Sequence, residues 1–175
     1  MGGGTGGSGL DGFARFVVLA LRVLNAMLAL AIVVTLACTF VYEPAWLAYY
    51  AKRHTELEAA TILYRLRWWG VVGWAVFPLM HLMLTKLLAM LDTVRAGDPF
   101  VPDNARRLTQ IAWLLLGLQL MHLVHGAFAS SLSAVGAHVD WKFSWSGWVA
   151  VLLTFVLARV FEQGTRMRAD LEGTV

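Results

Sequence analysis

The chain has 175 residues, of which 59% are hydrophobic and 14% are charged. Soluble domains carry about 25% charged residues, and a soluble globule of this length has more surface than so few charges could cover. Intrinsic disorder is excluded by the hydrophobic content, and a disulfide-stapled secreted scaffold is excluded because the sequence has one cysteine. The composition therefore predicts an integral membrane protein.

Glycine dominates the start of the chain, MGGGTGGSGLDG, so we expect a flexible segment over residues 1–12 and a single domain over residues 13–175. A helix that crosses about 30 Å of hydrocarbon needs about 20 apolar residues. Four stretches meet this need, the last with its flanks: 16–41, 68–91, 111–129 and 145–161. Because lipid offers no partner to unpaired backbone groups, we expect helices. The predicted fold class is all-α, an integral membrane bundle of four transmembrane helices.

Positive charge predicts the orientation of these spans. Four spans place both termini on one side of the membrane, and nine of the 14 Lys and Arg residues fall on that side, against five on the other. The nine are Arg15, Arg22, Lys86, Arg95, Arg106, Arg107, Arg159, Arg166 and Arg168. By the positive-inside rule, we expect both termini in the cytoplasm.

Aromatic residues gather toward the opposite, outer face, where amphipathic rings settle among the lipid headgroups. Between the first two spans, residues 43–67 form an outer segment in which a mixed set of side chains recurs every three or four positions. They are Trp46, Tyr50, His54, Leu57, Thr61 and Tyr64, followed by Trp68. This spacing predicts an interfacial helix with a mixed face. A plain anchoring loop and a lid over an outward-facing pocket are the alternatives.

The connection over residues 92–110 forms the predicted cytoplasmic elbow. Gly97 suits the C-terminal cap of the second span, and the pair Asp98-Pro99 favours a turn. Pro102 fits the first turn of the next helix. We therefore expect a rigid, tightly folded elbow that offers a surface to a cytoplasmic partner.

Two further elbow residues have predicted roles. Asn104 can cap the third span or bridge the two helices, and Phe100 is placed to fold back against the hairpin. The elbow is similar to that of a bacterial family of small four-helix membrane proteins, the DUF2975 family, in these residues: Gly97, Asp98, Pro99, Phe100, Pro102, Asn104, Arg107 and Leu108. The tail resembles that family's ending in Phe161-x-x-Gly164 and in Asp170-Leu171-Glu172-Gly173-Thr174-Val175.

The resemblance implies a multi-pass protein of the bacterial inner membrane without established catalytic residues. Many members of the family look like partners of a small cytoplasmic helix-turn-helix regulator. The resemblance therefore implies a regulatory role for this chain, exercised through the elbow and the C-terminal helix.

Three basic residues lie one to two turns inside the predicted cytoplasmic boundary: Arg22, Lys86 and Arg159. An ionised side chain at the centre of a span costs about 2.5–3.5 kcal/mol on insertion scales, so each needs a reason. They can snorkel to the headgroups, or they can pair with Asp92 and Glu162 at the same level. A third possibility is a cationic ring that binds an anionic lipid.

Histidines form the second polar cluster, near the middle of the membrane. His81 lies on the second span, and His122 and His125 lie on the third beyond Gln119. Imidazoles on facing helices can bind a haem, through His81 and His122, or a transition metal, through all three histidines. Nearby methionine sulfur suits Cu(I), in Met80, Met83 and Met121. A proton-responsive or ligand-responsive core, and hydrogen bonds that fix the helix register, are the alternatives.

Catalysis has little support in the sequence, because no acidic residue lies inside the four apolar stretches and no Ser–His–acid order is suggestive. Direct nucleic-acid binding is not expected either, because the net charge of +3 comes from scattered loop arginines. The leading hypothesis is a non-enzymatic membrane sensor or regulator with a cytoplasmic partner. The alternative is a haem-binding, metal-binding or small-solute transport protein built on the histidines.

Overall fold

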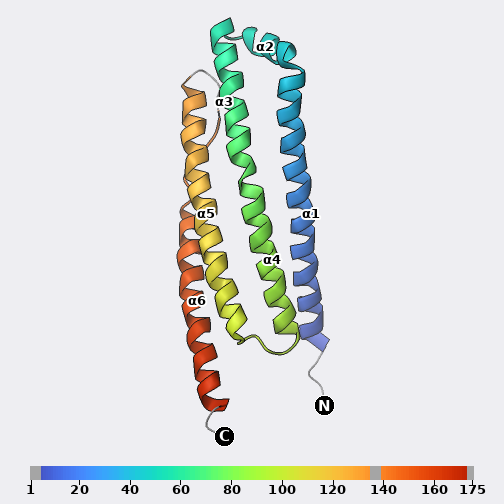
Figure 1. Cartoon of the computed structure of the whole chain (residues 1–175), viewed down its shortest axis with the longest axis vertical. Helices are drawn as coiled ribbons and strands as arrows, with labels where there is room; N and C mark the ends of the chain where they lie inside the picture. The colour runs from blue at the N-terminus through green and yellow to red at the C-terminus, as the bar shows by residue number, and fades with distance from the viewer. Residues whose placement is uncertain (1–4, 135–138, 173–175) are drawn as a thin grey trace.

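A computed structural model describes residues 5–134 and 139–172, and these residues form six α-helices (Figure 1). The helices are α1 (Thr5–Val41), α2 (Glu43–Ala51), α3 (Glu56–Trp74), α4 (Val76–Arg95), α5 (Pro102–Ser133) and α6 (Trp145–Glu172). Four stretches are long and apolar enough to cross a membrane: Gly12–Val41, Glu56–Arg95, Pro102–Ser133 and Trp145–Leu171. The predicted all-α class with four membrane-spanning helices is confirmed.

The helices form an open row. α1 packs on α3 and α4, α5 packs on the same two helices, and α6 packs on α5 alone, with no close backbone contact between α6 and α1 or α4 in the described residues. Large apolar side chains on the two edge helices are exposed, such as Phe16 on α1 at 67% and Leu152 on α6 at 65%. Lipid tails solvate such side chains without penalty, so an open row of apolar helices suits a bilayer.

α1 begins earlier than the composition predicts. The segment 1–12 was expected to be flexible, but the helix includes its residues from Thr5 onward, and residues 1–4 lie outside the described part of the chain. Glycine disfavours a helix by about 1 kcal/mol per residue relative to alanine. Each residue that extends an existing helix adds one backbone hydrogen bond, and this gain opposes the low helix propensity of glycine. A prediction from composition alone leaves this gain out.

The outer segment 43–67 is not one interfacial helix, and that prediction is wrong. α2 ends at Ala51, and a second helix, α3, begins after Thr55 and runs along the row. The Thr55 side chain accepts from the Glu58 backbone N–H at 3.3 Å, while the Glu58 carboxylate accepts from the Thr55 N–H at 2.8 Å. This capping box starts a new helix and interrupts the regular spacing of aromatic residues.

α3 and α4 follow one another with a break at Ala75, between Trp74 and Val76. Pro78 has no backbone N–H, so the Trp74 carbonyl loses its helical partner, and a kink follows at this point. Just after the break, the Phe77 carbonyl at the start of α4 accepts a hydrogen bond of 3.1 Å from the Asn25 side chain on α1. The predicted second span, residues 68–91, therefore lies across the break in a longer apolar stretch, Glu56–Arg95.

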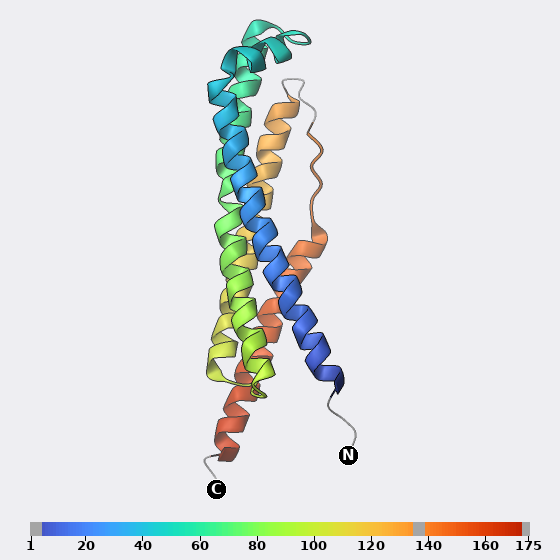
Figure 2. The ribbon, with the colours of Figure 1, turned by 90° about the vertical axis from the view of Figure 1, so that its right-hand side faces the viewer.

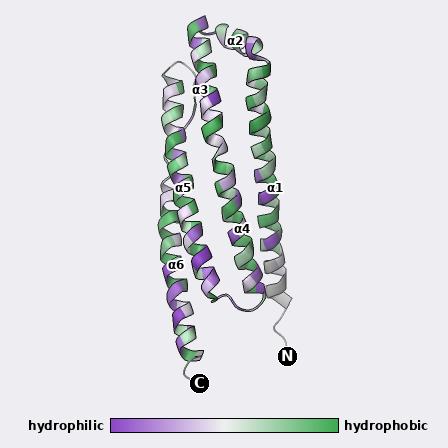
Figure 3. Cartoon of the chain, in the orientation of Figure 1, coloured by the Kyte–Doolittle hydropathy of each residue, from purple (hydrophilic) through white to green (hydrophobic). Residues whose placement is uncertain are grey.

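Both termini lie at the same end of the row as the connection between α4 and α5, which agrees with the predicted four-span topology (Figures 1 and 2). α6 starts part of the way down α5 and continues past the elbow, while residues 139–144 run back along α5 (Figure 2). Hydrophilic residues gather on α5 and α6 near this end (Figure 3). The projecting end of α6 therefore carries many polar side chains.

Candidate functional site

The elbow begins with a glycine cap on α4. Gly97 has a φ of 85°, a left-handed conformation that residues with a Cβ rarely adopt. Its N–H donates to the Val94 carbonyl at 3.0 Å, and the Asp98 N–H donates to the Thr93 carbonyl at 3.1 Å. These two bonds form a Schellman motif, so the predicted C-terminal cap is confirmed.

Asn104 is the buried centre of the elbow, with 0% of its surface exposed. Its amide nitrogen donates to Thr93 Oγ1 at 2.5 Å and to the Pro99 carbonyl at 3.0 Å. Its amide oxygen accepts from Arg107 at 3.0 Å, and Arg107 also approaches the Ala89 carbonyl at 3.4 Å. Asn104 therefore bridges α4, the loop and α5, the second of its two predicted roles.

Phe100 does not fill its own hairpin, and that expectation is corrected. The centroid of its ring lies 5.3 Å from that of Phe161 on α6. The same ring lies so close to Gly164 that a Cβ at that position would come within 3.2 Å of it. An ion pair between Asp98 and Arg168 joins the same two segments. The reason is that α6 continues past the elbow and offers an apolar face there. The first motif of the tail that resembles the family, Phe161-x-x-Gly164, contacts the elbow. The last three residues of the second motif, 173–175, lie outside the described residues.

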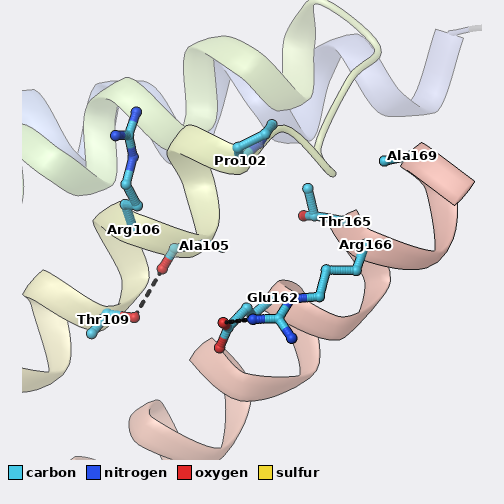
Figure 4. Close-up of a pocket in the computed structure, with 8 residues that line it drawn as sticks. All are labelled: Pro102, Ala105, Arg106, Thr109, Glu162, Thr165, Arg166 and Ala169. Atoms are coloured by element: carbon cyan, nitrogen blue, oxygen red, sulfur yellow. Dashed lines mark hydrogen bonds and ion pairs between the residues drawn. The ribbon is translucent and has the colours of Figure 1, made fainter.

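A groove of about 540 Å³ lies between the start of α5 and the end of α6 (Figure 4). Its lining residues are Pro102, Ala105, Arg106, Thr109, Glu162, Thr165, Arg166 and Ala169. Arg166 donates to Glu162 at 2.6 Å, and Arg106 pairs with Asp103. The side chains of Arg106 and Arg166 are 76% and 73% exposed, so their charged ends stand at the rim.

The predicted cationic ring of Arg22, Lys86 and Arg159 is not assembled. Arg22 approaches His81 Nε2 at 3.4 Å, Lys86 donates to Gln110 at 2.5 Å, and Arg159 donates to Glu162 at 3.0 Å. Arg22 and Arg159 belong to α1 and α6, the two edges of the row. A single anionic headgroup would therefore have to reach from one edge of the row to the other to contact both arginines. Each of the three cations contacts a different side chain.

The predicted centre of His81, His122 and His125 is not formed either. Among residues 5–134 and 139–172, no three His, Cys, Asp or Glu side chains come together to hold a metal ion. His81 faces Arg22 of α1, whereas the other two histidines line a cavity of about 410 Å³ between α4 and α5. Haem binding by His81 with His122 stays a prediction.

Arg67 has a structural role that the sequence did not reveal. It donates to Thr39 Oγ1 at 3.2 Å, to the Thr39 carbonyl and to Glu43 at 2.8 Å. Its guanidinium also lies over the Phe40 ring, 4.0 Å from the centroid. The side chain is 16% exposed, and Thr39 is 2% exposed. In the sequence, Arg67 contributes only to the charge balance that predicts the membrane orientation. No residue close to Arg67 in the sequence indicates that Thr39, 28 residues earlier, is its partner.

Residues 46–175 match the family described as Protein of unknown function (DUF2975). The matched residues include α3 to α6 and most of α2, and they leave out α1. No curated protein and no solved structure matches the chain. The elbow and the face of α6 that contacts it both lie within the matched residues, and the chain belongs to the DUF2975 family of proteins of unknown function.

Proposed function

We propose that this chain is a non-enzymatic, multi-pass protein of the bacterial inner membrane that docks a small soluble helix-turn-helix regulator. Its groove between α5 and α6 would hold an amphipathic helix of that regulator. Both termini would then lie in the cytoplasm. The proposal rests on the groove at the terminus-bearing end of the molecule and on the family resemblance of the elbow beside it.

Small side chains support a helix as the occupant. Pro102, Ala105 and Ala169 line the groove, and a second helix can approach closely where such residues lie. The loop before α5 is attached to α6 beside the groove, because the rings of Phe100 and Phe161 pack with their centroids 5.3 Å apart and Asp98 pairs with Arg168. A rigid groove loses little conformational freedom on binding, which favours affinity.

The charged groups at the rim can exchange partners with a docked helix. Two exposed arginines, Arg106 and Arg166, pair with the carboxylates of Asp103 and Glu162, and acidic and basic side chains of a partner helix can compete for these pairs. Rim charges steer association and select among partners more than they add affinity. α6 continues past the elbow, so a soluble protein can reach this groove without entering the lipid (Figure 2).

A photo-reactive amino acid at Ala169, in the full-length protein expressed in its own host, tests the proposal. Ala169 lines the groove, whereas Met167, two residues earlier, lies on a different face of α6 and is 62% exposed. We expect Ala169 to crosslink to a soluble helix-turn-helix protein, identified by mass spectrometry, and Met167 to leave it unlabelled. A bulky Ala169→Trp change should reduce capture about tenfold or more from a probe at Thr165, because it fills the groove.

Equal labelling from Ala169 and Met167, or products that are membrane proteins alone, would refute the docking role. Orientation is tested separately. Protease added to sealed, inside-out vesicles should remove tags from both termini, and protection of either tag would place it on the opposite side. That result would leave the groove facing away from any cytoplasmic regulator.

A further inference from the structure

Arg22 and His81 meet between α1 and α4, well inside the apolar part of both helices. The Arg22 guanidinium approaches His81 Nε2 at 3.4 Å. One turn further along each helix, the Asn25 side chain donates to the Phe77 carbonyl at 3.1 Å, and this bond fixes α1 against α4 at the level where the two side chains meet. Arg22 lies about 15 Å from the start of the apolar stretch Gly12–Val41.

The positive charge of Arg22 has no carboxylate beside it. Arginine stays protonated in proteins, so it donates and His81 Nε2 accepts with its lone pair, which requires a neutral imidazole. Within residues 5–134 and 139–172, neither side chain has a further hydrogen-bond or ion-pair partner. The acidic residue of α4, Asp92, lies about 16 Å along the helix from His81 and pairs with Arg15 at 2.8 Å. Of the two α1–α4 contacts, one is a balanced ion pair and the other carries an uncompensated cation.

The uncompensated cation is open to the surroundings of the protein. His81 is exposed, and Arg22 is half-buried. Ala26 and Pro78, one turn away on the same faces of α1 and α4, are also exposed. Short side chains at such positions let another helix approach closely. In a bilayer these surroundings are hydrocarbon, where an ionised side chain is costly and is usually paired.

The group that covers this cation has to bring negative charge to the same depth. A second copy of the chain has none to offer, because no Asp or Glu lies within the apolar stretches 16–41, 68–91, 111–129 and 145–161. A lipid phosphate lies at the membrane surface, and it would have to move about 10 Å deeper than the level of the Arg15–Asp92 pair. A transmembrane helix of another protein can present a carboxylate at any depth, so it fits this position best.

We propose that Arg22 and His81 dock a transmembrane helix of a partner protein through an Asp or Glu side chain within that helix. The two carboxylate oxygens can accept two parallel N–H bonds from the guanidinium, while the contact with His81 Nε2 holds the guanidinium on its other side. Apolar side chains gain little from leaving lipid for one another, so a charged pair of this kind selects the partner. The surface belongs to α1 and α4 and does not depend on the α5–α6 groove.

Designed transmembrane peptides of leucine and alanine test the charge requirement with the full-length protein in liposomes. One peptide carries a single Asp about 10 Å from the end of its apolar segment, and the matched peptide carries Asn there. At about pH 8, which favours the ionised carboxylate, FRET should show that the Asp peptide associates about tenfold more tightly. Equal association of the two peptides with the wild-type protein would overturn the proposal, and no variant has to fold for this comparison.

Variants of the two α1 arginines then locate the site. R22Q should abolish the preference for the Asp peptide, whereas R15Q, at the arginine that already has a carboxylate partner, should keep it. A preference that persists in R22Q would refute the assignment to Arg22. Loss of the preference in both variants would refute it as well, because the effect would then follow the net charge of α1.

Crosslinking in the native host identifies the natural occupant. A photo-reactive amino acid at Ala26 faces the site, whereas one at Leu24, which is 50% exposed, lies at a similar depth on the opposite face of α1. We expect Ala26 alone to capture a membrane protein with an Asp or Glu inside a spanning helix, and the Asn or Gln variant of that acid to reduce capture about tenfold. Capture of phospholipid alone would assign Arg22 to a headgroup and overturn the proposal. Capture that is unchanged by the partner's Asn or Gln variant would overturn it too.

Discussion

The two ends of the helix row are held together by different kinds of interaction. At the elbow, Asn104 connects partners that lie between three and eleven residues away, and the glycine cap of α4 is formed by neighbouring residues. At the opposite end of the row, named the outer end here because it lies away from the elbow, Arg67 connects α3 to Thr39 and Glu43, 28 and 24 residues away. The turn between α4 and α5 is therefore specified by local sequence, whereas the packing of the elbow on α6 and the structure of the outer end depend on contacts between distant segments.

The two ends also differ in their sensitivity to mutation. The elbow shares its stability among a cap, a turn and an amide network, so removal of one part leaves the others in place. At the outer end, the largely buried cation of Arg67 satisfies Thr39 and the carboxylate of Glu43 together, and Arg65 donates to the Ser131 carbonyl of α5. Coupled contacts of this kind are lost as a unit. The following changes test this difference.

The largest loss of stability is expected from Arg67→Met. The change keeps much of the aliphatic stem but leaves the Thr39 carbonyl and hydroxyl without this donor. We expect a decrease of about 3 kcal/mol in the free energy of unfolding in mixed micelles. Arg53→Met, at an exposed position of the same end, is the matched control and should change it by less than about 0.5 kcal/mol. Equal effects would show that Arg67 is not the centre of the outer end.

Asn104→Ala should follow, with a decrease of about 2 kcal/mol, because a fully buried residue loses two donated bonds and one accepted bond. Asn25→Ala, which removes a single bond to the Phe77 carbonyl, is the control and should lower stability by about 1 kcal/mol. Denaturant titration of both variants gives the comparison. A smaller loss at Asn104 than at Asn25 would contradict the role of Asn104 as a bridge.

Gly97→Ala should cost about 1 kcal/mol, because alanine at a φ of 85° is strained. The glycine has open space around it, so the effect isolates backbone strain from crowding. Gly12→Ala on α1, also in open space, should be neutral or stabilising, because alanine is the better helix former. Stabilisation by both alanines, measured by thermal unfolding, would show that the cap does not require glycine.

The smallest effect is expected from Arg15→Gln. The ion pair between Arg15 and Asp92 measures 2.8 Å, but the two side chains are 42% and 48% exposed. Water screens such a pair, so we expect a loss below about 0.5 kcal/mol. Double-mutant cycles with Asp92→Asn measure the coupling. A coupling as large as the Arg67 effect would show that α1 and α4 depend on this pair.

Sequence patterns predicted the features that neighbouring residues determine. The four apolar stretches, the cap at Gly97 and the bridge at Asn104 all follow from short-range spacing or propensity. Phe100 was assigned the wrong partner because the path of α6 past the elbow depends on packing between helices. The aromatic spacing over residues 43–67 concealed a helix start, although Thr55 and Glu58 have the spacing of a capping box.

The histidines show the same limit within the membrane. His81 and His122 lie on neighbouring helices, as the spans indicate, but helix rotation turns His81 toward Arg22 on α1. Rotation about a helix axis depends on contacts with neighbouring helices, and hydropathy does not report it. That His122 and His125 line a cavity between α4 and α5, apart from His81, therefore required the three-dimensional arrangement.

The position of α6 at the edge of the row has a mechanical consequence. A pulling force applied at the C-terminus acts on an interface with one neighbour, α5, together with the contacts at the elbow. In a single-molecule experiment on the protein in a bilayer, α6 would peel away first, and the remaining helices would stay packed. Tension on the C-terminus would therefore open the groove first, because its two walls are α5 and α6.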